Sequence, residues 1–443
     1  MVIFSVITFT VTGSNSPLSQ QTNSSSTLQT LVGQSGLNSA NSKRLVVKFG
    51  GSSLADRKRI EHAAHMISKE SRKGTKLVVV VSAMGKMTDQ LISLVNHSDK
   101  SDLDDVLAMG ERTSIRIFAA ALKAEGLDAR YFDPSDAEWP IITDDEFSDA
   151  NPMVELCVQN VQKHVLPLLD SGTIPVIAGF IGRSTKGRVS TIGRGGSDTT
   201  AFIIAKGIAA NEVILVTDAD GILSADPKII PNAKKLEKID VKTLIGLADS
   251  GTKFIHRKAL RYKDADIPVR VIGHHKDDLD ADGTVISGSI SNEIEVTFAS
   301  NSPTMSVTVA GRGISENPAI ISELSQAIKE NSMLNGLSAD FDSIIFYAPQ
   351  DSDTLLDKVH SAVTKHSEVV AIAVQRDLAF LRIKGVGLED TPGIIGRISM
   401  LLRENRINIF GILTLASGIL VFISWGDKEK AMNLMKQVIT ESF

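Results

Sequence analysis

The chain lacks several features that mark particular classes of protein. It has one cysteine, Cys157, in 443 residues, which excludes an intrachain disulfide and a cysteine metal cluster and fits a reducing compartment. The apolar stretch from Val2 to Val11 is too short to span a bilayer. The net charge of -5 gives no reason to expect electrostatic binding to nucleic acid. We therefore expect a cytoplasmic protein whose partners are small molecules or other protein chains, and neither a membrane nor nucleic acid.

Charged side chains are missing from the start of the chain. The first 42 residues hold no Lys, Arg, Asp or Glu and are rich in Ser, Thr, Asn and Gln. Such a segment cannot bury enough apolar surface to offset the entropy of ordering. It also lacks the basic start and the cleavage site of a signal peptide, and the Arg residues of a transit peptide. We expect residues 1–42 to be a disordered tail.

From Arg44 onward, short β-branched runs alternate with longer amphipathic stretches. We expect strands at 44–49, 76–82, 174–179 and 212–217, and helices at 57–72, 102–125, 151–171 and 198–209. This alternation predicts a parallel sheet covered by helices. In such folds the ligand crevice lies beyond the carboxyl ends of the strands, so the residues that follow each strand are the candidates for a site.

Beyond about residue 290 the chain contains an internal repeat, with an offset of about 74 positions. Residues of the first copy recur in the second as Gly385, Pro392, Ile395, Ser399, Glu404 and Asn405. In the first copy we expect a strand at 305–311, a helix at 316–330, strands at 334–340 and 343–348, and a helix at 353–365. This order predicts two ferredoxin-like modules.

The first predicted strand delivers Lys48 at its end, followed at once by Gly50, Gly51, Ser52 and Ser53. Glycines let the backbone approach a ligand closely, and the start of the next helix adds partial positive charge. The segment suits the phosphates of a nucleotide, although the lysine precedes the glycines and the segment is therefore no Walker A loop. A purely structural strand-to-helix turn is the alternative.

A second segment, Gly193 to Asp198, is more specific because it combines Arg194 with two glycines and an acid at the expected start of a helix. Arg194 can hold a carboxylate bidentately, and the glycines offer amides to anionic oxygens. Asp198 has a second interpretation as a helix N-cap. A third segment, Thr217 to Gly221, carries Asp218 and Asp220 out of a strand, and suits the base and ribose of a nucleotide. A calcium loop lacks support there because a strand precedes it, and a plain Asp-Gly turn is the remaining alternative.

These three segments, in this order and followed by the repeat, resemble the aspartate kinases of the amino-acid kinase superfamily, from Arg44 to Phe443. The resemblance implies an α/β protein: a three-layer αβα catalytic domain with a mostly parallel central sheet at 43–290, and two C-terminal ferredoxin-like ACT domains at 291–376 and 377–443. The implied activity is transfer of the γ-phosphoryl group of ATP, with Mg²⁺, to the β-carboxylate of L-aspartate. This reaction opens lysine, threonine and methionine biosynthesis. An amino-acid effector at the ACT domains and a homodimer or higher homo-oligomer are also implied.

The resemblance further implies roles for individual residues. Lys48 and Asp198 are expected to be catalytic, with Lys48 on the transferring phosphoryl group. The expected nucleotide contacts are Lys48, Gly50, Gly51, Ser52, Thr217, Asp218, Ile222 and Lys253. The expected aspartate contacts are Thr88, Glu111, Phe180, Arg194 and Ser197. Glu111 would pair with the substrate ammonium and Arg194 with its α-carboxylate. No metal ligand is assigned.

The chain departs from the family pattern at two places. Arg257 follows His256 where the family usually has proline. In the second repeat, Thr391, Pro392 and Gly393 form the turn whose backbone amides would bind an effector, here called the effector turn. The first repeat has Ala319 in place of Gly393, so its effector turn lacks glycine's backbone freedom. Two other functions stay open from the sequence. A non-catalytic amino-acid sensor is expected to lose Lys48, Asp198 or Lys253, and a related kinase acting on another small carboxylate is expected to lose Glu111, Arg194 or the ACT pair.

Overall fold

The structure of the protein is a computed structural model. It describes residues 42–95, 99–248, 255–290, 294–351, 353–385, 388, 393–415 and 418–442. The predicted tail up to residue 41, the predicted nucleotide contact Lys253, and Thr391 and Pro392 of the second effector turn lie outside the described residues. Within them, no helix is long and apolar enough to cross a membrane.

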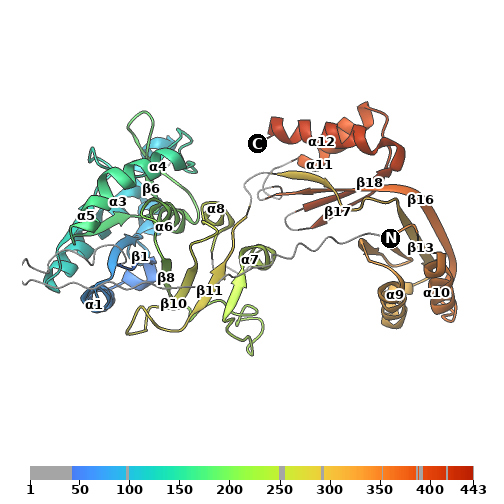
Figure 1. Ribbon diagram of the computed structural model, residues 1–443, viewed down its shortest axis with the longest axis horizontal. Helices are drawn as coiled ribbons and strands as arrows, with labels where there is room; N and C mark the ends of the chain where they lie inside the picture. Colours follow the sequence, from blue (N-terminus) through green and yellow to red (C-terminus); the bar gives the residue numbers. More distant parts are fainter. Residues whose placement is uncertain are drawn as a thin grey trace, which may run out of the picture. The chain divides into compact units, whose positions relative to one another are not determined.

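Residues 43–290, the expected catalytic domain and here called the catalytic part, are built on an eight-stranded sheet (Figure 1). Its strands follow one another in the order β3 (Ala129–Phe132), β5 (Ile174–Ala178), β2 (Lys76–Val81), β1 (Arg44–Phe49), β8 (Glu212–Thr217), β10 (Val269–Gly273), β11 (Thr284–Ser287) and β9 (Lys238–Asp240). Every neighbouring pair is parallel except β10 and β11. The predicted mostly parallel sheet is confirmed.

Both faces of the sheet are buried. Successive residues of a strand point to opposite faces, and Leu45, Val46 and Val47 are all fully buried. The covering helices of the catalytic part are α1 (Arg57–Arg72), α2 (Met87–Leu94), α3 (Lys100–Ala124), α4 (Val154–Asn160), α5 (Leu166–Asp170), α6 (Gly196–Gly207), α7 (Val241–Ala248) and α8 (Arg257–Leu260). A layer of helices therefore lies on each side of the sheet, as the three-layer expectation requires.

The helix predicted at 151–171 is present but irregular. It runs as α4, a π-helical turn η2 (Val161–Val165) and α5. Pro167 stands in the first turn of α5. Because proline has no N–H to donate to the carbonyl four residues earlier, the regular helical ladder is interrupted just before it.

The strands β4 (Ile142–Thr143), β6 (Ile181–Ser184) and β7 (Val189–Thr191) form a small second sheet. Strand β6 follows the turn after β5, and β7 leads directly into the glycine-arginine segment that begins at Gly193. This sheet therefore positions two of the segments that the sequence predicted as functional.

The two repeats form one antiparallel sheet of seven strands. The first module consists of β13 (Thr304–Gly311), η3 (Ile314–Glu316), α9 (Pro318–Asn331), β14 (Gly336–Ala339), β15 (Ser343–Pro349) and α10 (Asp353–Val363). The second consists of α11 (Ile394–Glu404), β17 (Ile409–Leu415), β18 (Gly418–Ser424), η4 (Trp425–Asp427) and α12 (Lys428–Ser442). Each module has its own apolar core, as expected for ferredoxin-like units.

Two strands cross the boundary between the repeats that the sequence predicted at residues 376 and 377. Strand β16 (Val369–Lys384) pairs with β13 of the first module through its first half and with β18 of the second through its second half. Strand β12 (Glu295–Phe298) precedes the first module in sequence but pairs with Leu381 to Lys384, and its Val296 lies in the second core. In the structure the first module is thus inserted within the second.

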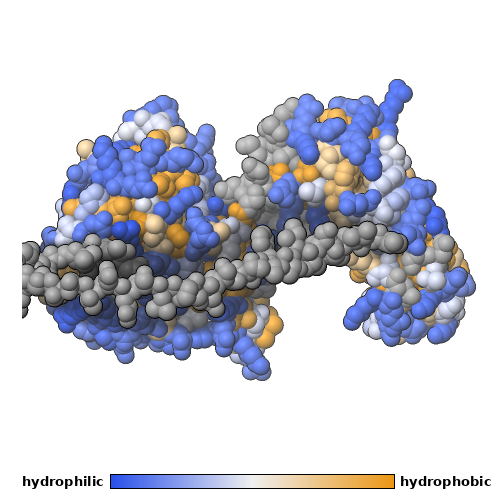
Figure 2. Space-filling model, in the orientation of Figure 1, coloured by the Kyte–Doolittle hydropathy of each residue, from blue (hydrophilic) through white to orange (hydrophobic). Residues whose placement is uncertain are grey.

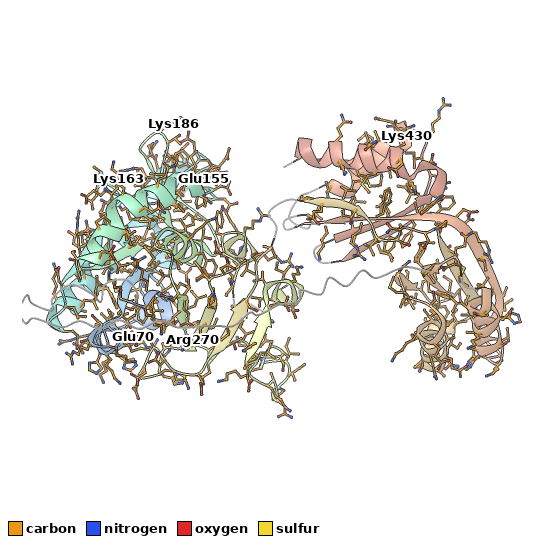
Figure 3. All side chains as sticks on the ribbon, viewed as in Figure 1. Glu70, Glu155, Lys163, Lys186, Arg270 and Lys430 are labelled. Carbon is orange, nitrogen blue, oxygen red and sulfur yellow. The ribbon has the colours of Figure 1, made fainter. Side chains whose placement is uncertain are left out.

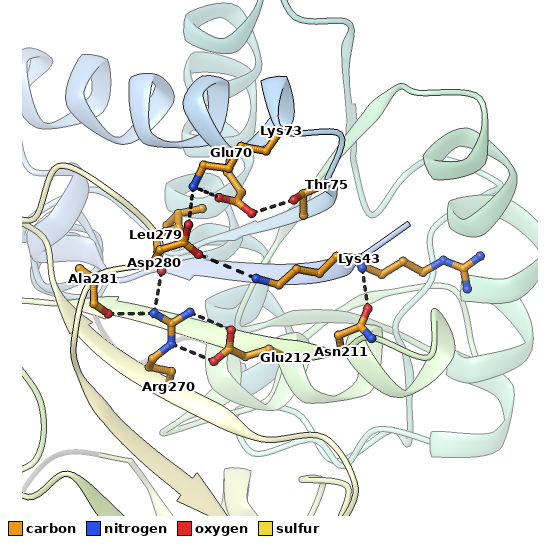
Figure 4. A network of polar contacts seen from close by, with 11 residues as sticks. Lys43, Glu70, Lys73, Thr75, Asn211, Glu212, Arg270, Leu279, Asp280 and Ala281 are labelled. Carbon is orange, nitrogen blue, oxygen red and sulfur yellow. Dashed lines mark hydrogen bonds and ion pairs between the residues drawn. The ribbon is translucent and has the colours of Figure 1, made fainter. Parts of the chain in front are cut away.

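Charged groups at the amino ends of the central strands form a network of hydrogen bonds and ion pairs, here called the amino-end cluster, which includes Arg270, Glu212, Glu70, Lys73 and Asp280 (Figure 4). Arg270 of β10 donates two hydrogen bonds, both of 2.8 Å, to Glu212 of β8, and two more to the carbonyls of Leu279 and Ala281. Glu212 holds the pKa of Arg270 above its usual range. Figure 3 labels Arg270 of β10 and Glu70 of α1. This cluster lies at the opposite strand ends from the predicted site.

We expect Arg270→Met to destabilise the catalytic domain by about 3 to 5 kcal/mol, because it leaves a largely buried Glu212 carboxylate without its partner. Chemical denaturation monitored by circular dichroism measures this change. The double variant Glu212→Gln with Arg270→Met is expected to recover part of the loss. A change below about 1 kcal/mol in the single variant would show that the pair is unimportant for stability.

The surface of the described residues is mostly hydrophilic on the face shown in Figure 2, with apolar side chains in smaller groups. Exposed apolar residues of the catalytic part include Ile92 and Leu94 on α2 and Ile117 on α3. A groove of about 900 Å³ between α1, α2 and α3 is lined partly by Ile60, Met84 and Ile117. It is separate from the cavity described next.

Candidate active site

A cavity of about 270 Å³ opens at the carboxyl ends of the main strands. It is lined by Lys48, Thr88, Glu111, Phe180, Gly193, Arg194, Gly195, Gly196, Ser197 and Asp198. All five predicted aspartate contacts and both predicted catalytic residues lie around this one space. They come from β1, α2, α3, the turn after β5, the segment between β7 and α6, and the first turn of α6.

Lys48 and Asp198 form an ion pair in the cavity wall. Lys48 Nζ lies 2.7 Å from Asp198 Oδ1, and the two side chains are only 16% and 11% exposed. The contact lacks hydrogen-bond geometry, so Asp198 Oδ1 has no hydrogen-bond donor. The ion pair fixes the position of the Lys48 ammonium, which places a positive charge in the wall of the cavity where an anionic substrate would bind.

The arginine loop, Gly193 to Ser197, turns the chain from β7 into α6. Gly195 is the N-cap of α6 and has φ +78°, a conformation that favours glycine. Asp198 therefore lies inside the first turn of α6, and its interpretation as the N-cap is wrong. The first turn of this 12-residue helix borders the cavity, and the positive end of the helix dipole favours negative charge there.

Arg194 stands at the exposed tip of the arginine loop. No hydrogen bond or ion pair of its guanidinium is found within the part of the chain that the structure describes. Since an arginine fork matches the two oxygens of a carboxylate, Arg194 is available to a ligand that enters the cavity.

The turn after β5 fits tightly against the arginine loop. Phe180 adopts φ +67°, which is uncommon for a residue with a side chain. A Cβ on Gly179 would lie 2.6 Å from the Cβ of Ser197, so only glycine fits there. Ser197 Oγ accepts a hydrogen bond of 2.9 Å from Ser82 Oγ at the end of β2. These contacts fix the position of Ser197 at the cavity.

Glu111 brings a buried acid to the cavity from the middle of α3. The residue is 2% exposed, and Oε1 accepts a hydrogen bond of 3.1 Å from the backbone N–H of Ala83. Oε2 has no hydrogen-bond partner. Burial raises the pKa of Glu111 to about 7, although the N–H of Ala83 opposes the shift. An unpaired carboxylate oxygen at a cavity wall is suited to an ammonium group of a ligand.

Apart from Lys48, the predicted nucleotide contacts that the structure describes are not part of the cavity lining. Gly51 must be glycine, because a Cβ there would lie 2.6 Å from the carbonyl of Ala83. Gly50 and Ser52 belong to the same turn, at the start of η1 (Gly51–Leu54). Thr217 ends β8, and its hydroxyl donates to Asp218. Ile222 is a core residue whose N–H and carbonyl are both already hydrogen-bonded, so only its packing is available to a nucleotide.

Two charged residues behind the cavity were not identified from the sequence. Asp104 of α3 is fully buried and accepts hydrogen bonds from the backbone and hydroxyl of Ser148 and of Thr191. Lys258 of α8 contacts the carbonyl of Ile192, next to the arginine loop. Asp104 lies two helical turns before Glu111, on the same face of α3, and an acid at that spacing is the one signal that the sequence offered.

Residues 43–273 match the Amino acid kinase family, and the chain belongs to that family. The match covers the cavity and every strand of the main sheet except β11. Among curated proteins, the aspartokinase of Rickettsia conorii is 31% identical over 413 residues, covering 88% of this chain and 97% of the relative. The aspartokinase of Corynebacterium glutamicum is 30% identical over 412 residues, covering 89% and 95%. Within the family, the chain is therefore grouped with the aspartokinases.

Solved structures agree on the fold. Aspartate kinase from Synechocystis superposes with a TM-score of 0.72 at 24% identity, over 89% of this chain and 69% of that one. E. coli aspartokinase III, solved in complex with aspartate and ADP, superposes with a TM-score of 0.52 at 20% identity, over 90% and 100%. The predicted combination of an amino-acid kinase domain with C-terminal ferredoxin-like modules is confirmed.

Proposed function

We propose that this protein transfers the γ-phosphoryl group of ATP to the β-carboxylate of L-aspartate, giving 4-phospho-L-aspartate and ADP. The observation that carries the proposal is the cavity that joins Lys48, Arg194 and Glu111. An α-amino acid presents one ammonium and one α-carboxylate, and Glu111 and Arg194 offer the matching charges. Lys48 then faces the remaining carboxylate and the phosphoryl group.

The reaction needs no general base. A carboxylate is ionised at pH 7 and is already a competent nucleophile, so the lack of a histidine in the cavity lining is no obstacle. The difficulty is that two anions must be held in line. Positioning, together with positive charge, therefore supplies the catalysis. Lys48 neutralises the oxygens of the transferring group, Asp198 orients Lys48, and the glycines at 50 and 51 admit the phosphates.

ATP is expected to bring Mg²⁺ with it. Among the described residues, no group of three or more His, Cys, Asp or Glu side chains is arranged to hold a metal ion. Mg²⁺ commonly binds through phosphate oxygens, water and one or two carboxylates, and Asp198, whose carboxylate borders the cavity beside Lys48, would supply one such ligand. When bound, the ion would neutralise phosphate charge.

We also propose regulation by an amino acid at the ferredoxin-like modules and assembly into a homodimer or higher homo-oligomer. The first half of β16, Val369 to Asp377, pairs with β13 along one edge, and no described strand covers its other edge. Its residues 369–375 carry no charge. Such an edge is a template for a further strand, which supports pairing with a second copy. Cytoplasmic location and a place in lysine, threonine and methionine synthesis stay predictions.

The direct test is ADP release with aspartate as acceptor, compared with glutamate and homoserine. Hydroxylamine in the assay converts an acyl phosphate into a hydroxamate. Of the three acceptors, we expect only aspartate to give both ADP release and hydroxamate. Adding lysine, threonine or methionine to the aspartate assay and measuring the rate again tests regulation. Preferential turnover of glutamate would indicate a kinase for another carboxylate. Absence of turnover would favour the non-catalytic sensor, which the intact Lys48 and Asp198 pair argues against.

A further inference from the structure

Lys258 is a nearly buried lysine whose partners gather at one place behind the cavity. Its side chain is 12% exposed. Its ammonium donates to the carbonyl of Ile192 at 2.8 Å, to the carbonyl of Ala150 at 3.1 Å, and to the carbonyl and Oδ1 of Asp149 at 3.0 and 2.7 Å. Lys258 does not line the cavity, so it cannot act on a substrate directly.

The partners of Lys258 all adjoin the arginine loop. Ile192 is the residue before Gly193, and Ala150 donates its backbone N–H to the carbonyl of Thr191 in β7. Asp149 lies so close to the loop that a Cβ on Gly193 would be 2.3 Å from Asp149 Oδ1. The ammonium therefore joins the strand that enters the loop to the segment that runs beside it.

Helix α8 also touches the loop at a second point. A Cβ on Gly195 would lie 2.6 Å from the Cβ of His256 and 3.4 Å from the Cβ of Ala259. The two glycines that flank Arg194 thus rest on the Lys258 contacts and on α8. Since Gly193 and Gly195 both have positive φ, glycine flexibility would leave Arg194 poorly fixed without such support.

We propose that Lys258 is a positioning residue of the aspartate site, which holds the arginine loop in the conformation that presents Arg194 and Ser197 to the cavity. The proposal rests on the proposed function, because it takes Arg194 to bind the α-carboxylate of aspartate. Displacing a binding group by about 1 Å can cost on the order of a hundredfold in activity. Loss of Lys258 should therefore weaken the binding of aspartate and leave the binding of ATP nearly unchanged.

Lys263 provides a matched control on the chain that leaves α8. It is also buried, and its ammonium donates to the carbonyls of Asp264, Ile267 and Gly288. None of these adjoins the arginine loop. Lys258→Met and Lys263→Met therefore remove similar sets of hydrogen bonds, and only the first removes support from Arg194. Asp149→Ala is a milder variant, because the Asp149 side chain is 77% exposed.

The experiment measures KM for aspartate, KM for ATP and kcat in full-length variants, with melting temperature as the check of folding. We expect Lys258→Met to raise KM for aspartate by roughly tenfold to a hundredfold, with KM for ATP changed less than about threefold. Lys258→Arg is expected to restore part of the affinity, and Asp149→Ala to cause a smaller rise in KM. Lys263→Met should lower the melting temperature and leave KM for aspartate unchanged.

Arg194→Ala separates the two hypotheses. If Arg194→Ala raises KM for aspartate and folded Lys258→Met does not, the positioning role is wrong and the proposed function stands. If Arg194→Ala leaves KM for aspartate unchanged, the assignment of Arg194 in the proposed function is itself wrong. Equal rises of both KM values in Lys258→Met and Lys263→Met would also overturn the positioning role. If Lys258→Met does not fold, an unchanged KM for aspartate in Asp149→Ala decides against the positioning role.

Discussion

Replacing Lys48 by alanine is expected to lower kcat by on the order of a hundredfold or more, the scale for removal of one preorganised charge contact in an active site. Lys48 stands at the end of a central strand and is paired with Asp198 at 2.7 Å. Its ammonium is thus held in place before substrate arrives. Because the charge on the transferring phosphoryl oxygens develops in the transition state, the loss should fall mainly on kcat rather than on KM for aspartate.

Steady-state ADP release at saturating ATP and aspartate measures this effect. Lys206→Met is a suitable control, because Lys206 is an exposed lysine in the last turn of α6, the helix that carries Asp198 in its first turn. We expect the control to keep normal turnover. Normal turnover in purified Lys48→Ala would instead remove Lys48 from the catalytic role.

Replacing Glu111 by glutamine is expected to raise KM for aspartate by roughly a hundredfold, since a truncated or neutralised partner of a buried charge pair costs about 2 to 5 kcal/mol. The substitution keeps the shape of the side chain and an oxygen for the N–H of Ala83. It removes only the charge that would pair with the substrate ammonium. Initial rates over a range of aspartate concentrations measure it, and an unchanged KM would place the ammonium elsewhere.

The pH dependence gives Glu111 a second signature. Burial raises its pKa to about 7 in the free protein, whereas the ammonium of aspartate requires the carboxylate form. Affinity for aspartate should therefore fall as the pH drops through about 7, and Glu111→Gln should lose that dependence. Lys48, Arg194 and Asp198 share the cavity, so the comparison with Glu111→Gln is what assigns the titration to Glu111.

The raised pKa also predicts a change in stability without substrate. The folded protein binds the Glu111 proton more tightly than the unfolded chain does, so protonation stabilises the fold below the ordinary pKa of 4.5. That contribution is lost as the pH rises from about 4.5 through about 7. Glu111→Gln is therefore expected to be more stable than the parent at pH 8 and similar at pH 4.

Local patterns in the sequence were sufficient for the elements that build the catalytic sheet. The strand at 44–49 and the helix at 57–72 are present with the predicted bounds, because a continuous β-branched run and an amphipathic stretch capped by Asp56 specify them locally. The helix predicted to start at Asp198 begins at Gly196 instead. Its start is set by the left-handed conformation of Gly195, which a sequence does not display.

The predicted site residues also came together around one cavity, since their order along the chain matched a known family. The residues that support the cavity from outside its lining were not predicted from the sequence. Asp104 and Lys258 act through partners 44 to 109 positions away, and Lys258 is one of many lysines in the sequence. Their contacts are all tertiary, so the sequence offered no signal for Lys258 and only the spacing from Glu111 for Asp104.

The shared strand β16 has a practical consequence for anyone who wishes to study the effector modules in isolation. A gene fragment beginning at residue 377 would cut this strand in the middle and would also omit β12, which completes the second core. Such a fragment would expose apolar surface that the complete sheet buries, and we expect it to aggregate. A fragment that starts before Glu295 and retains both repeats is the smallest piece that preserves every strand of this sheet.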